Sequence, residues 1–416
     1  MALFDDFLGK LGIARHWMTV AAAFTLPWTT TGQAIAIGLF TLLAVLTIRP
    51  ARLAATMRHP AALLPTLLFL LILVSMLWST QPFGPSGMDH YAKLLLIPLL
   101  MATSISPRQA LHIAYGFLAA SSILLVLSWA GILWPAGPFD WFKNVGVPVK
   151  DNAVQSLCFV LCGFGLALGA WRLRSENRTR AMLMALLALL FLANIHFIFV
   201  SKTGLLGEIA LAGLFLLHIT TWQRALLLFI PTVLVIALAL SFSAPAQHRL
   251  NEFASDMRAQ DVSGESVSTA ARIDFWNKAI VFIKQAPLLG HGSGSTLGLY
   301  QAEETTHPSP YGGPTSDPHN QILAITIQVG LSGAVLLVLM WLSHARLFLG
   351  RNFACAMGQA VVLLNVVGSL FNSHLSTITQ GVLYCLAVGV LGAITMHKTV
   401  QPALEKPTAE SLAPST

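Results

Sequence analysis

The sequence predicts an all-α polytopic membrane protein, with about twelve transmembrane helices and one long loop outside the membrane. Hydrophobic residues make up 55% of the 416 residues and charged residues only 10%, whereas a soluble chain carries about 25% charged residues. The mean hydropathy is +0.71. Apolar runs near the roughly twenty residues that cross a bilayer recur from end to end. None has the short alternating pattern of a membrane β-barrel strand.

Twelve apolar runs mark the predicted spans. Their approximate cores are 15–30, 33–48, 61–78, 92–105, 109–131, 152–171, 181–200, 203–220, 223–243, 319–341, 352–372 and 378–396. The first is interrupted by Pro27 and a polar stretch, and the fourth is short. Residues 1–10 are polar and acidic and lead straight into further spans, so we expect no cleavable signal peptide.

The distribution of arginine and lysine predicts the orientation of the spans. Every second short loop carries arginine: Arg49, Arg52, Arg58, Arg108, Arg172, Arg174, Arg178, Arg180, Arg224, Arg346 and Arg351. The alternate loops hold only lysine: Lys93, Lys143, Lys150 and Lys202. Because positive residues gather on the cytoplasmic side, both termini are predicted to be cytoplasmic. The long loop 244–318 then lies outside, which is the periplasm if the cell is Gram-negative.

Composition divides the chain into four parts. Residues 1–243 hold nine spans, 244–318 form the external loop, 319–396 hold three spans, and 397–416 form a tail that we expect to be disordered. The net charge of +7 is mostly cytoplasmic arginine, and no soluble basic and aromatic segment predicts nucleic-acid binding. All four cysteines lie in apolar runs without histidine or carboxylate companions, so we expect small buried side chains.

The external loop contains one well-marked helix. Ser268 or Thr269 can cap a helix over 270–285, and Pro287 ends it. Four of its residues share one face: Arg272, Trp276, Ala279 and Ile283. Such an amphipathic helix is expected at the membrane interface. Upstream, 248–258 can form a short helix, and 261–269 is rich in serine and glycine and is expected to be mobile.

Three glycines follow Pro287, at Gly290, Gly292 and Gly294. A glycine-serine run can turn backbone N–H groups inward and form a nest for an anion. A flexible connector is an equally good interpretation of the same residues.

The loop ends in a helix-start signal that includes a histidine. Asp317 is the predicted N-cap and Pro318 the first residue of the tenth span. This places His319 in the first turn at the outer surface. The positive end of a helix dipole favours the neutral imidazole, which can accept a proton, whereas Asp317 acts in the opposite direction. A histidine that only caps its own loop is the alternative interpretation.

Three motifs carry a resemblance to a known family. Residues 319–323 (His-Asn-Gln-Ile-Leu) with 329–333 (Val-Gly-Leu-Ser-Gly) resemble a signature of the O-antigen ligase and O-antigen polymerase superfamily. The stretch 272–279, which leads to Pro-Leu-Leu-Gly-His-Gly at 287–292, also resembles it. Residues 201–204 (Ser-Lys-Thr-Gly) are similar to the family's Ser-Arg-Thr-Gly junction between two spans, with lysine where arginine is usual.

The resemblance implies a membrane-embedded, metal-independent and cofactor-free glycosyltransferase of GT-C-like fold, with inversion at the anomeric carbon. Such proteins take a glycan from an undecaprenyl diphosphate carrier at the outer face of the bacterial inner (plasma) membrane. Ligases pass it to a sugar of lipid A–core in lipopolysaccharide biosynthesis, polymerases to another repeat unit, and related oligosaccharyltransferases to protein. A ligase is favoured, because the polymerases often have other loop layouts and the protein-directed transferases are usually longer. The expected partners are the carrier-linked donor, the lipid A–core acceptor and membrane lipids.

The chemistry assigns expected roles to individual residues. A base must take the proton of the acceptor hydroxyl, and cations must stabilise the departing diphosphate. His319 is the expected base, and Arg272 is the first diphosphate ligand because its fork matches phosphate geometry. Lys202, Lys93 and Lys150 are further candidates for the diphosphate, although the last two can instead be lysines that direct their charge to the membrane surface. The expected supporting residues are Asp317, Asn320, Trp276, Gly290 and Gly292.

Other polar residues near the outer face are expected to be structural. These are His196, His291 and His374. Glu208 lies within the eighth span below Lys202, so both a functional acid and a structural pair with Lys202 are expectations. A transporter is the competing class of protein, but transporters usually show inverted repeats and helices broken near the midplane. Here the polar residues gather at one face, which favours an enzyme.

Overall fold

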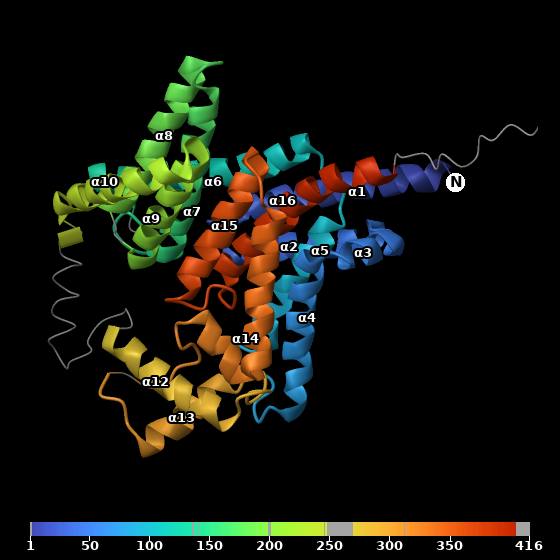
Figure 1. The fold of residues 1–416 in the computed structure, drawn as a ribbon, viewed down its shortest axis with the longest axis vertical. Helices are drawn as coiled ribbons and strands as arrows, with labels where there is room; N and C mark the ends of the chain where they lie inside the picture. Colours follow the sequence, from blue (N-terminus) through green and yellow to red (C-terminus); the bar gives the residue numbers. More distant parts are fainter. Residues whose placement is uncertain are drawn as a thin grey trace, which may run out of the picture.

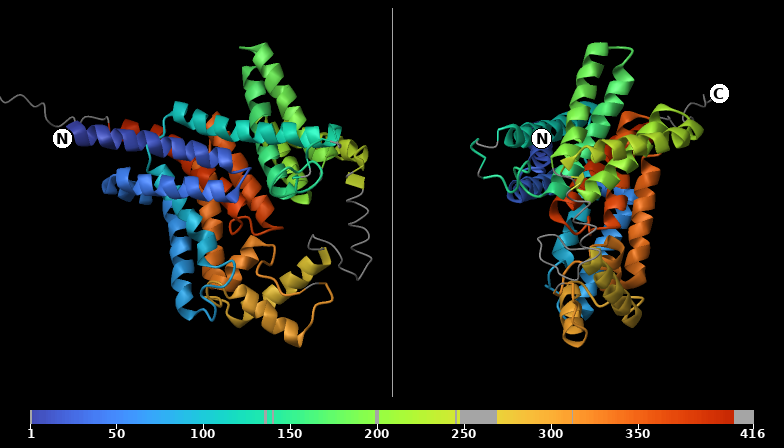
Figure 2. Two further views of the ribbon diagram at one scale, coloured as in Figure 1. Left: turned by 180° about the vertical axis from the view of Figure 1, so that it is seen from behind. Right: turned by 90° about the vertical axis from the view of Figure 1, so that its left-hand side faces the viewer.

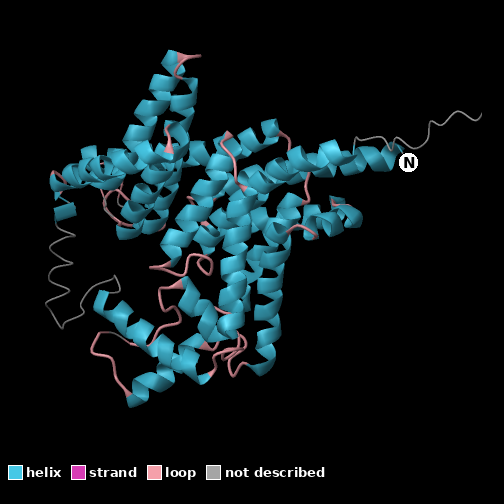
Figure 3. Cartoon of the chain, in the orientation of Figure 1, coloured by secondary structure: helices cyan, strands magenta, loops and turns pink. Residues whose placement is uncertain are grey.

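The computed structural model describes residues 2–134, 137–139, 141–198, 201–244, 246–247, 269–311 and 313–404. These residues form helices joined by loops, with no β-strand among them (Figure 3). The all-α polytopic prediction is therefore confirmed. The expected short helix over 248–258 and the expected mobile stretch up to residue 268 lie outside the described residues.

The helices follow one another along the whole chain (Figure 1). They are α1 (Ala2–Thr25), α2 (Thr30–Thr47), α3 (Pro50–Met57), α4 (Pro60–Ser75), η1 (Met76–Trp78), η2 (Met88–Leu95), α5 (Leu96–Met101), α6 (Pro107–Leu133), α7 (Asn152–Leu173), α8 (Arg178–Phe197), α9 (Lys202–Ile219), α10 (Trp222–Ser241), α12 (Thr269–Gln285), α13 (Thr296–Thr306), α14 (Gln321–Leu347), α15 (Phe353–Ser369) and α16 (Ile378–Leu404).

Nine stretches of the described chain are long and apolar enough to cross a membrane: α2, α4 with η1, α6, α7, α8, α9, α10, α14 and α16 up to Met396. The other three predicted spans take different forms. The last but one is α15, an apolar helix below 18 residues, and the fourth is divided between η2 and α5. Asp89, His90 and Lys93 occupy η2, which shortens the apolar part of that span. The first falls in α1, whose N-terminal half is polar.

The C-terminal tail departs from its prediction in one respect. α16 continues to Leu404, so the first residues of the expected disordered tail are helical. Residues 397–401 contain neither glycine nor proline, so nothing in the sequence stops the helix at 396.

The packing distinguishes an enclosed helix from a peripheral one. In the most apolar 18-residue stretch of α7, 83% is buried, whereas in that of α10 only 6% is buried. α7 packs on α8 and α9, and α15 packs between α9 and α16. α10 contacts α8 and α9 and leaves most of its apolar side chains exposed, as expected of a helix that faces lipid.

A separate lobe stands at one end of the molecule. α4 and α14 lie side by side and extend away from the other long helices to α12 and α13 (Figures 1 and 2). This outer lobe, which comprises α12, α13 and the adjoining ends of α4 and α14, has a small apolar core of its own. Its buried members are Ala271, Phe275, Ala279, Phe282, Tyr300 and Ile327. The helix predicted over 270–285 is present as α12, and its apolar face packs on α13 and α14.

α14 is broken two turns after it begins. Val329 (φ −127°, ψ 15°) and Gly330 (φ 69°, ψ −169°) are not helical, and the two parts of the helix meet at a bend (Figure 1). The positive φ explains why glycine occupies position 330. The break places the Gln321–Gln328 part of α14 against α12 in the outer lobe.

Candidate functional site

The start of α14 differs from the sequence prediction. Asn320, not Asp317, is the N-cap, and its side chain accepts hydrogen bonds from the amides of Ile322 and Leu323. His319 precedes the cap with a left-handed backbone (φ 54°), and its N–H donates to Asp317 Oδ1 at 2.8 Å. The carboxylate of Asp317 is therefore used in a local turn, which displaces the helix start. The imidazole therefore belongs to a residue before the N-cap and not to the first turn of α14. The expected effect of the helix dipole assumed a place in the first turn and does not follow from this geometry.

The loop between α15 and α16 holds the histidine in place. His319 Nδ1 lies 3.2 Å from Asn372 Oδ1, and Ser373 Oγ donates to Asp317 Oδ1 at 2.6 Å. Asn320 Nδ2 donates to Leu370 O at 3.1 Å. Residues 370–377, which we call the inner loop, thus contact Asp317, His319 and Asn320. Residues 317–320 are called the His319 turn below. The imidazole remains accessible, with 21% of its side chain exposed.

α12 covers the other side of the imidazole. The rings of Phe275 and His319 stack at 6.3 Å with 24° between their planes. Trp276 Nε1 donates to Pro318 O at 3.0 Å, which ties the His319 turn to α12. Trp276 is one of the expected supporting residues, and this contact is consistent with that role.

Arg272 lies one turn before Trp276 and faces the same turn of the chain. Its guanidinium is partly buried, and among the described residues its Nε is enclosed without a hydrogen-bond partner. Burial lowers the pKa of Arg272, and the charge of Asp317 opposes this shift. The group nevertheless stays protonated at neutral pH. Arg272, Asp317 and His319, which two separate motifs contribute, therefore form one cluster with an unsatisfied cationic donor.

The first turn of α9 reaches the same loop. Ser201 caps α9 by accepting the amide of Gly204, which leaves Lys202 as the first helical residue. Thr203 Oγ1 accepts a hydrogen bond from Asn372 Nδ2 at 3.3 Å. The junction at 201–204 and the His319 turn are thereby connected through one side chain, Asn372.

Residues 186–338 match a family model described as O-antigen ligase. This part of the chain therefore resembles the O-antigen ligase superfamily, and residues 186–338 are called the O-antigen ligase domain below. No curated protein matches the chain. The superfamily comprises glycosyltransferase-type enzymes that are embedded in the membrane and act on lipid-linked glycans. The O-antigen ligase domain contains Lys202, Arg272 and His319, whereas Lys93, Lys150 and the inner loop lie outside the matched range.

Lys93 and Lys150, which lie outside the matched range, bond to the inner loop and to the start of α16, respectively. Lys93 Nζ donates to the carbonyls of Ser376 (3.0 Å) and Thr377 (2.6 Å). Lys150 Nζ donates to Leu26 O (2.6 Å) and to the hydroxyl of Thr379 (2.8 Å). Both ammonium groups thus point at oxygen atoms of the protein. This geometry favours structural roles over the direct diphosphate contact predicted from the sequence: Lys93 holds the inner loop, and Lys150 holds the start of α16.

The glycine-containing segment 287–294 supplies hydrogen-bond partners to the backbone at the break in α14. The amides of His291 and Gly292 donate to Ile327 O (2.9 Å) and Gln328 O (2.8 Å), two carbonyls that the break leaves without helical partners. In return, Leu331 N donates to Pro287 O at 2.8 Å. The remaining glycine amides are also used: Gly290 N bonds to Ala286 O, and Gly294 N bonds to Gln328 Oε1. The anion-nest interpretation is therefore wrong, because these N–H groups already bond within the protein. The same bonds tie the run to α14, which does not fit a loose connector.

Sequence reasoning missed the residues that join the inner loop to the O-antigen ligase domain. Gln321 is fully buried. It accepts the amides of Leu375 (2.7 Å) and Ser376 (3.2 Å), and its Nε2 donates to Tyr91 Oη at 3.1 Å. The available signal was the polar sequence Asn-Ser-His at 372–374, between two apolar runs.

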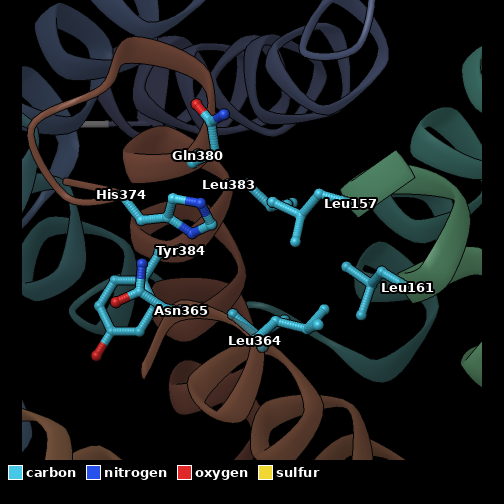
Figure 4. A pocket seen from close by; sticks show the side chains of 9 residues that line it. Leu157, Leu161, Leu364, Asn365, His374, Gln380, Leu383 and Tyr384 are labelled. Atoms are coloured by element: carbon cyan, nitrogen blue, oxygen red, sulfur yellow. The ribbon is translucent and has the colours of Figure 1, made fainter. Parts of the chain in front are cut away.

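The remaining histidines have structural surroundings. His196 Nε2 lies 2.7 Å from Glu208 Oε2, and both side chains are buried, so Glu208 pairs with a histidine. His291 Nε2 donates to Phe282 O at 2.8 Å. His374 lines a small cavity of about 10 Å³ between α7, α15 and α16 (Figure 4), which is close to the least space that holds one water molecule. Within the described residues, no three His, Cys, Asp or Glu side chains come together as a metal-binding group.

Proposed function

We propose that this protein is an O-antigen ligase that transfers the polysaccharide from undecaprenyl diphosphate to a sugar hydroxyl of lipid A–core. The observation that carries the proposal is the cluster of Arg272, Asp317 and His319. An accessible imidazole lies near the carboxylate of Asp317, and the charge of the same carboxylate acts on a guanidinium that has an enclosed, unsatisfied N–H. A base and a phosphate ligand in one cluster are what displacement of a diphosphate requires.

In the proposed reaction, His319 accepts the proton of the acceptor hydroxyl while that oxygen attacks the anomeric carbon of the donor glycan. The bond between this carbon and the diphosphate oxygen breaks, and its electron pair leaves with undecaprenyl diphosphate. Arg272 stabilises the developing charge through its planar fork, and Lys202 adds a point charge from the first turn of α9. A single displacement of this kind inverts the anomeric configuration.

We place this chemistry on the periplasmic face of the inner membrane, with both termini cytoplasmic. The support comes from the alternation of arginine-rich and lysine-only loops. Lys93 and Lys150, which the alternation assigns to the external side, both bond to the inner loop or the start of α16. His319 and Thr203, from two other external span ends, bond to the same loop. Span ends that were assigned to one side on charge alone thus meet around one site.

The test is deletion of the gene followed by inspection of the cell-surface polysaccharide. Lipid A–core without attached O-antigen, with full-length chains left on the carrier, is the expected result. A core that bears a single repeat would instead identify a polymerase. Unchanged lipopolysaccharide with an unglycosylated protein would identify a protein O-oligosaccharyltransferase with the same carrier.

A further inference from the structure

A histidine base must present the lone pair of one particular ring nitrogen to its substrate. Which nitrogen carries the proton is set by the hydrogen bond that the other nitrogen makes. We propose that Asn372 is a positioning residue that holds the proton of His319 on Nδ1 and thereby directs the free lone pair of Nε2 to the acceptor hydroxyl. This inference rests on the proposed function of His319.

The orientation of the Asn372 amide is the first step of the argument. Its Nδ2 donates to Thr203 Oγ1 at 3.3 Å, and its Oδ1 faces the imidazole. Oδ1 lies 3.2 Å from His319 Nδ1 and has no proton to donate. The contact is therefore satisfied only when Nδ1 carries the hydrogen.

Asp317 reinforces the same arrangement. Its Oδ2 lies 4.0 Å from His319 Nδ1, while its Oδ1 is occupied by the His319 amide and the Ser373 hydroxyl. Nδ1 thus faces two acceptor groups. Nε2, by contrast, makes no hydrogen bond within the part of the chain that the structure describes.

The ring plane is fixed as well as the tautomer. Phe275 stacks on the imidazole, which limits rotation about its side-chain bonds. The charged and titratable groups near this turn are Asp317 itself, Arg272 on α12 and His374 in the inner loop, both of which interact with Asp317. Lys202 is the residue before Thr203 at the start of α9. Asn372 is neutral, so it can orient the ring without adding a charge beside the base. A carboxylate at this position would also orient the ring, but it would hold the imidazole protonated to a higher pH.

This difference provides the test. Transfer from undecaprenyl diphosphate-linked O-antigen to lipid A–core is measured with purified protein, per folded molecule and as a function of pH. Asn372→Asp keeps the acceptor, so its turnover at high pH should approach that of the natural protein. The acid limb of its pH–rate profile should move to higher pH, because the added carboxylate keeps the imidazole of His319 protonated up to a higher pH. Asn372→Ala should lower turnover roughly tenfold, the effect of one lost hydrogen bond, with little change in KM for the donor.

Thr203 supplies a matched pair of variants. Thr203→Ser keeps the acceptor for Asn372 Nδ2 and should behave as the natural protein does. Thr203→Val has nearly the same volume but removes that acceptor, and should lower turnover severalfold. Equal turnover in both variants, or an unmoved acid limb in Asn372→Asp, would overturn the proposal.

A double variant separates this inference from the proposed function. If Asn372 acts through His319, Asn372→Ala should lower turnover no further once His319 is replaced by alanine. An additional, independent loss would mean that Asn372 acts elsewhere. Failure of the proposed function is distinct, because His319→Ala alone would then keep near-normal turnover.

Discussion

Gly290 and Gly330 lie in direct backbone contact, although one belongs to the external loop and the other to the break in α14. A Cβ atom on Gly290 would approach Gly330 N to 2.6 Å, and one on Gly330 would approach Leu288 O to 2.2 Å. Both residues have a left-handed backbone, with φ of 65° and 69°. The two glycine motifs are therefore two halves of one joint, which fixes the outer lobe to the long part of α14.

Replacement of Gly290 by alanine should destabilise this joint. The added methyl group meets backbone atoms that cannot move aside, and the left-handed backbone adds strain of about 1–3 kcal/mol. We expect a lower midpoint of thermal unfolding for the purified protein. Gly313→Ala is the matched control, because no atom lies within 4 Å of its added Cβ. Equal midpoints for the two variants would contradict this account of the joint.

The fold and the site were predictable to different extents. Hydropathy and charge alternation depend on local composition, so the polytopic fold and helix α12 followed directly from the sequence. The pairing of glycines 290 and 330 did not, because a glycine motif does not indicate which distant carbonyls its amides will meet. Asn372 was missed for a similar reason, since its importance arises only where the inner loop contacts the turns at His319 and Thr203. The N-cap was misplaced because Asp317 and Asn320 are both good capping residues. The left-handed backbone of His319 decides between them.

The topology predicts opposite accessibility for two exposed positions. Gly313, in the external loop, and Arg224, at the start of α10, are both exposed, and all four natural cysteines are buried. Cysteine at Gly313 should react with a membrane-impermeant thiol reagent in intact spheroplasts, whereas cysteine at Arg224 should react only after permeabilisation. The natural protein serves as the unlabelled control. The reverse labelling pattern would overturn the assignment of the site to the periplasm.

The packing of α13 on α12 should weaken in acid. Burial alone would raise the pKa of Glu304, but hydrogen bonds from the Ser309 amide and the Lys278 ammonium outweigh it and hold the pKa below its usual range. A lowered folded-state pKa stabilises the protein above the pKa of the unfolded chain, and this contribution is lost as the pH falls through the folded-state value. At neutral pH the natural protein should therefore have a higher midpoint of thermal unfolding than Glu304→Gln. The difference between the two midpoints should shrink below about pH 4. A difference that does not depend on pH would show that Glu304 acts by packing instead of charge.

Glycan transfer should not require a divalent metal. In the proposed mechanism Arg272 and Lys202 supply the positive charge that stabilises the departing diphosphate, so purified protein should keep its activity in excess EDTA. Parallel reactions with added magnesium or manganese provide the comparison. Activity that disappears on chelation and returns with either metal would refute a mechanism that relies on these side chains.

The roles of Arg272 and His319 should differ in kinetics. Arg272→Lys keeps a positive charge but lacks the bidentate fork, so both donor affinity and turnover should fall. His319 should affect mainly the rate, because in the proposed mechanism it takes the acceptor proton and does not bind the diphosphate. If both residues are only structural, activity in each variant will follow the amount of folded protein.

The most direct test of the account is turnover per folded molecule of His319→Asn. Asparagine tolerates the left-handed backbone at this position, so the variant removes the imidazole with little added strain. A positioned base contributes about a hundred- to ten-thousandfold, and turnover should fall within this range while donor binding and the unfolding midpoint stay near those of the natural protein. A well-folded His319→Asn protein with near-normal turnover would contradict the central claim that His319 is the base.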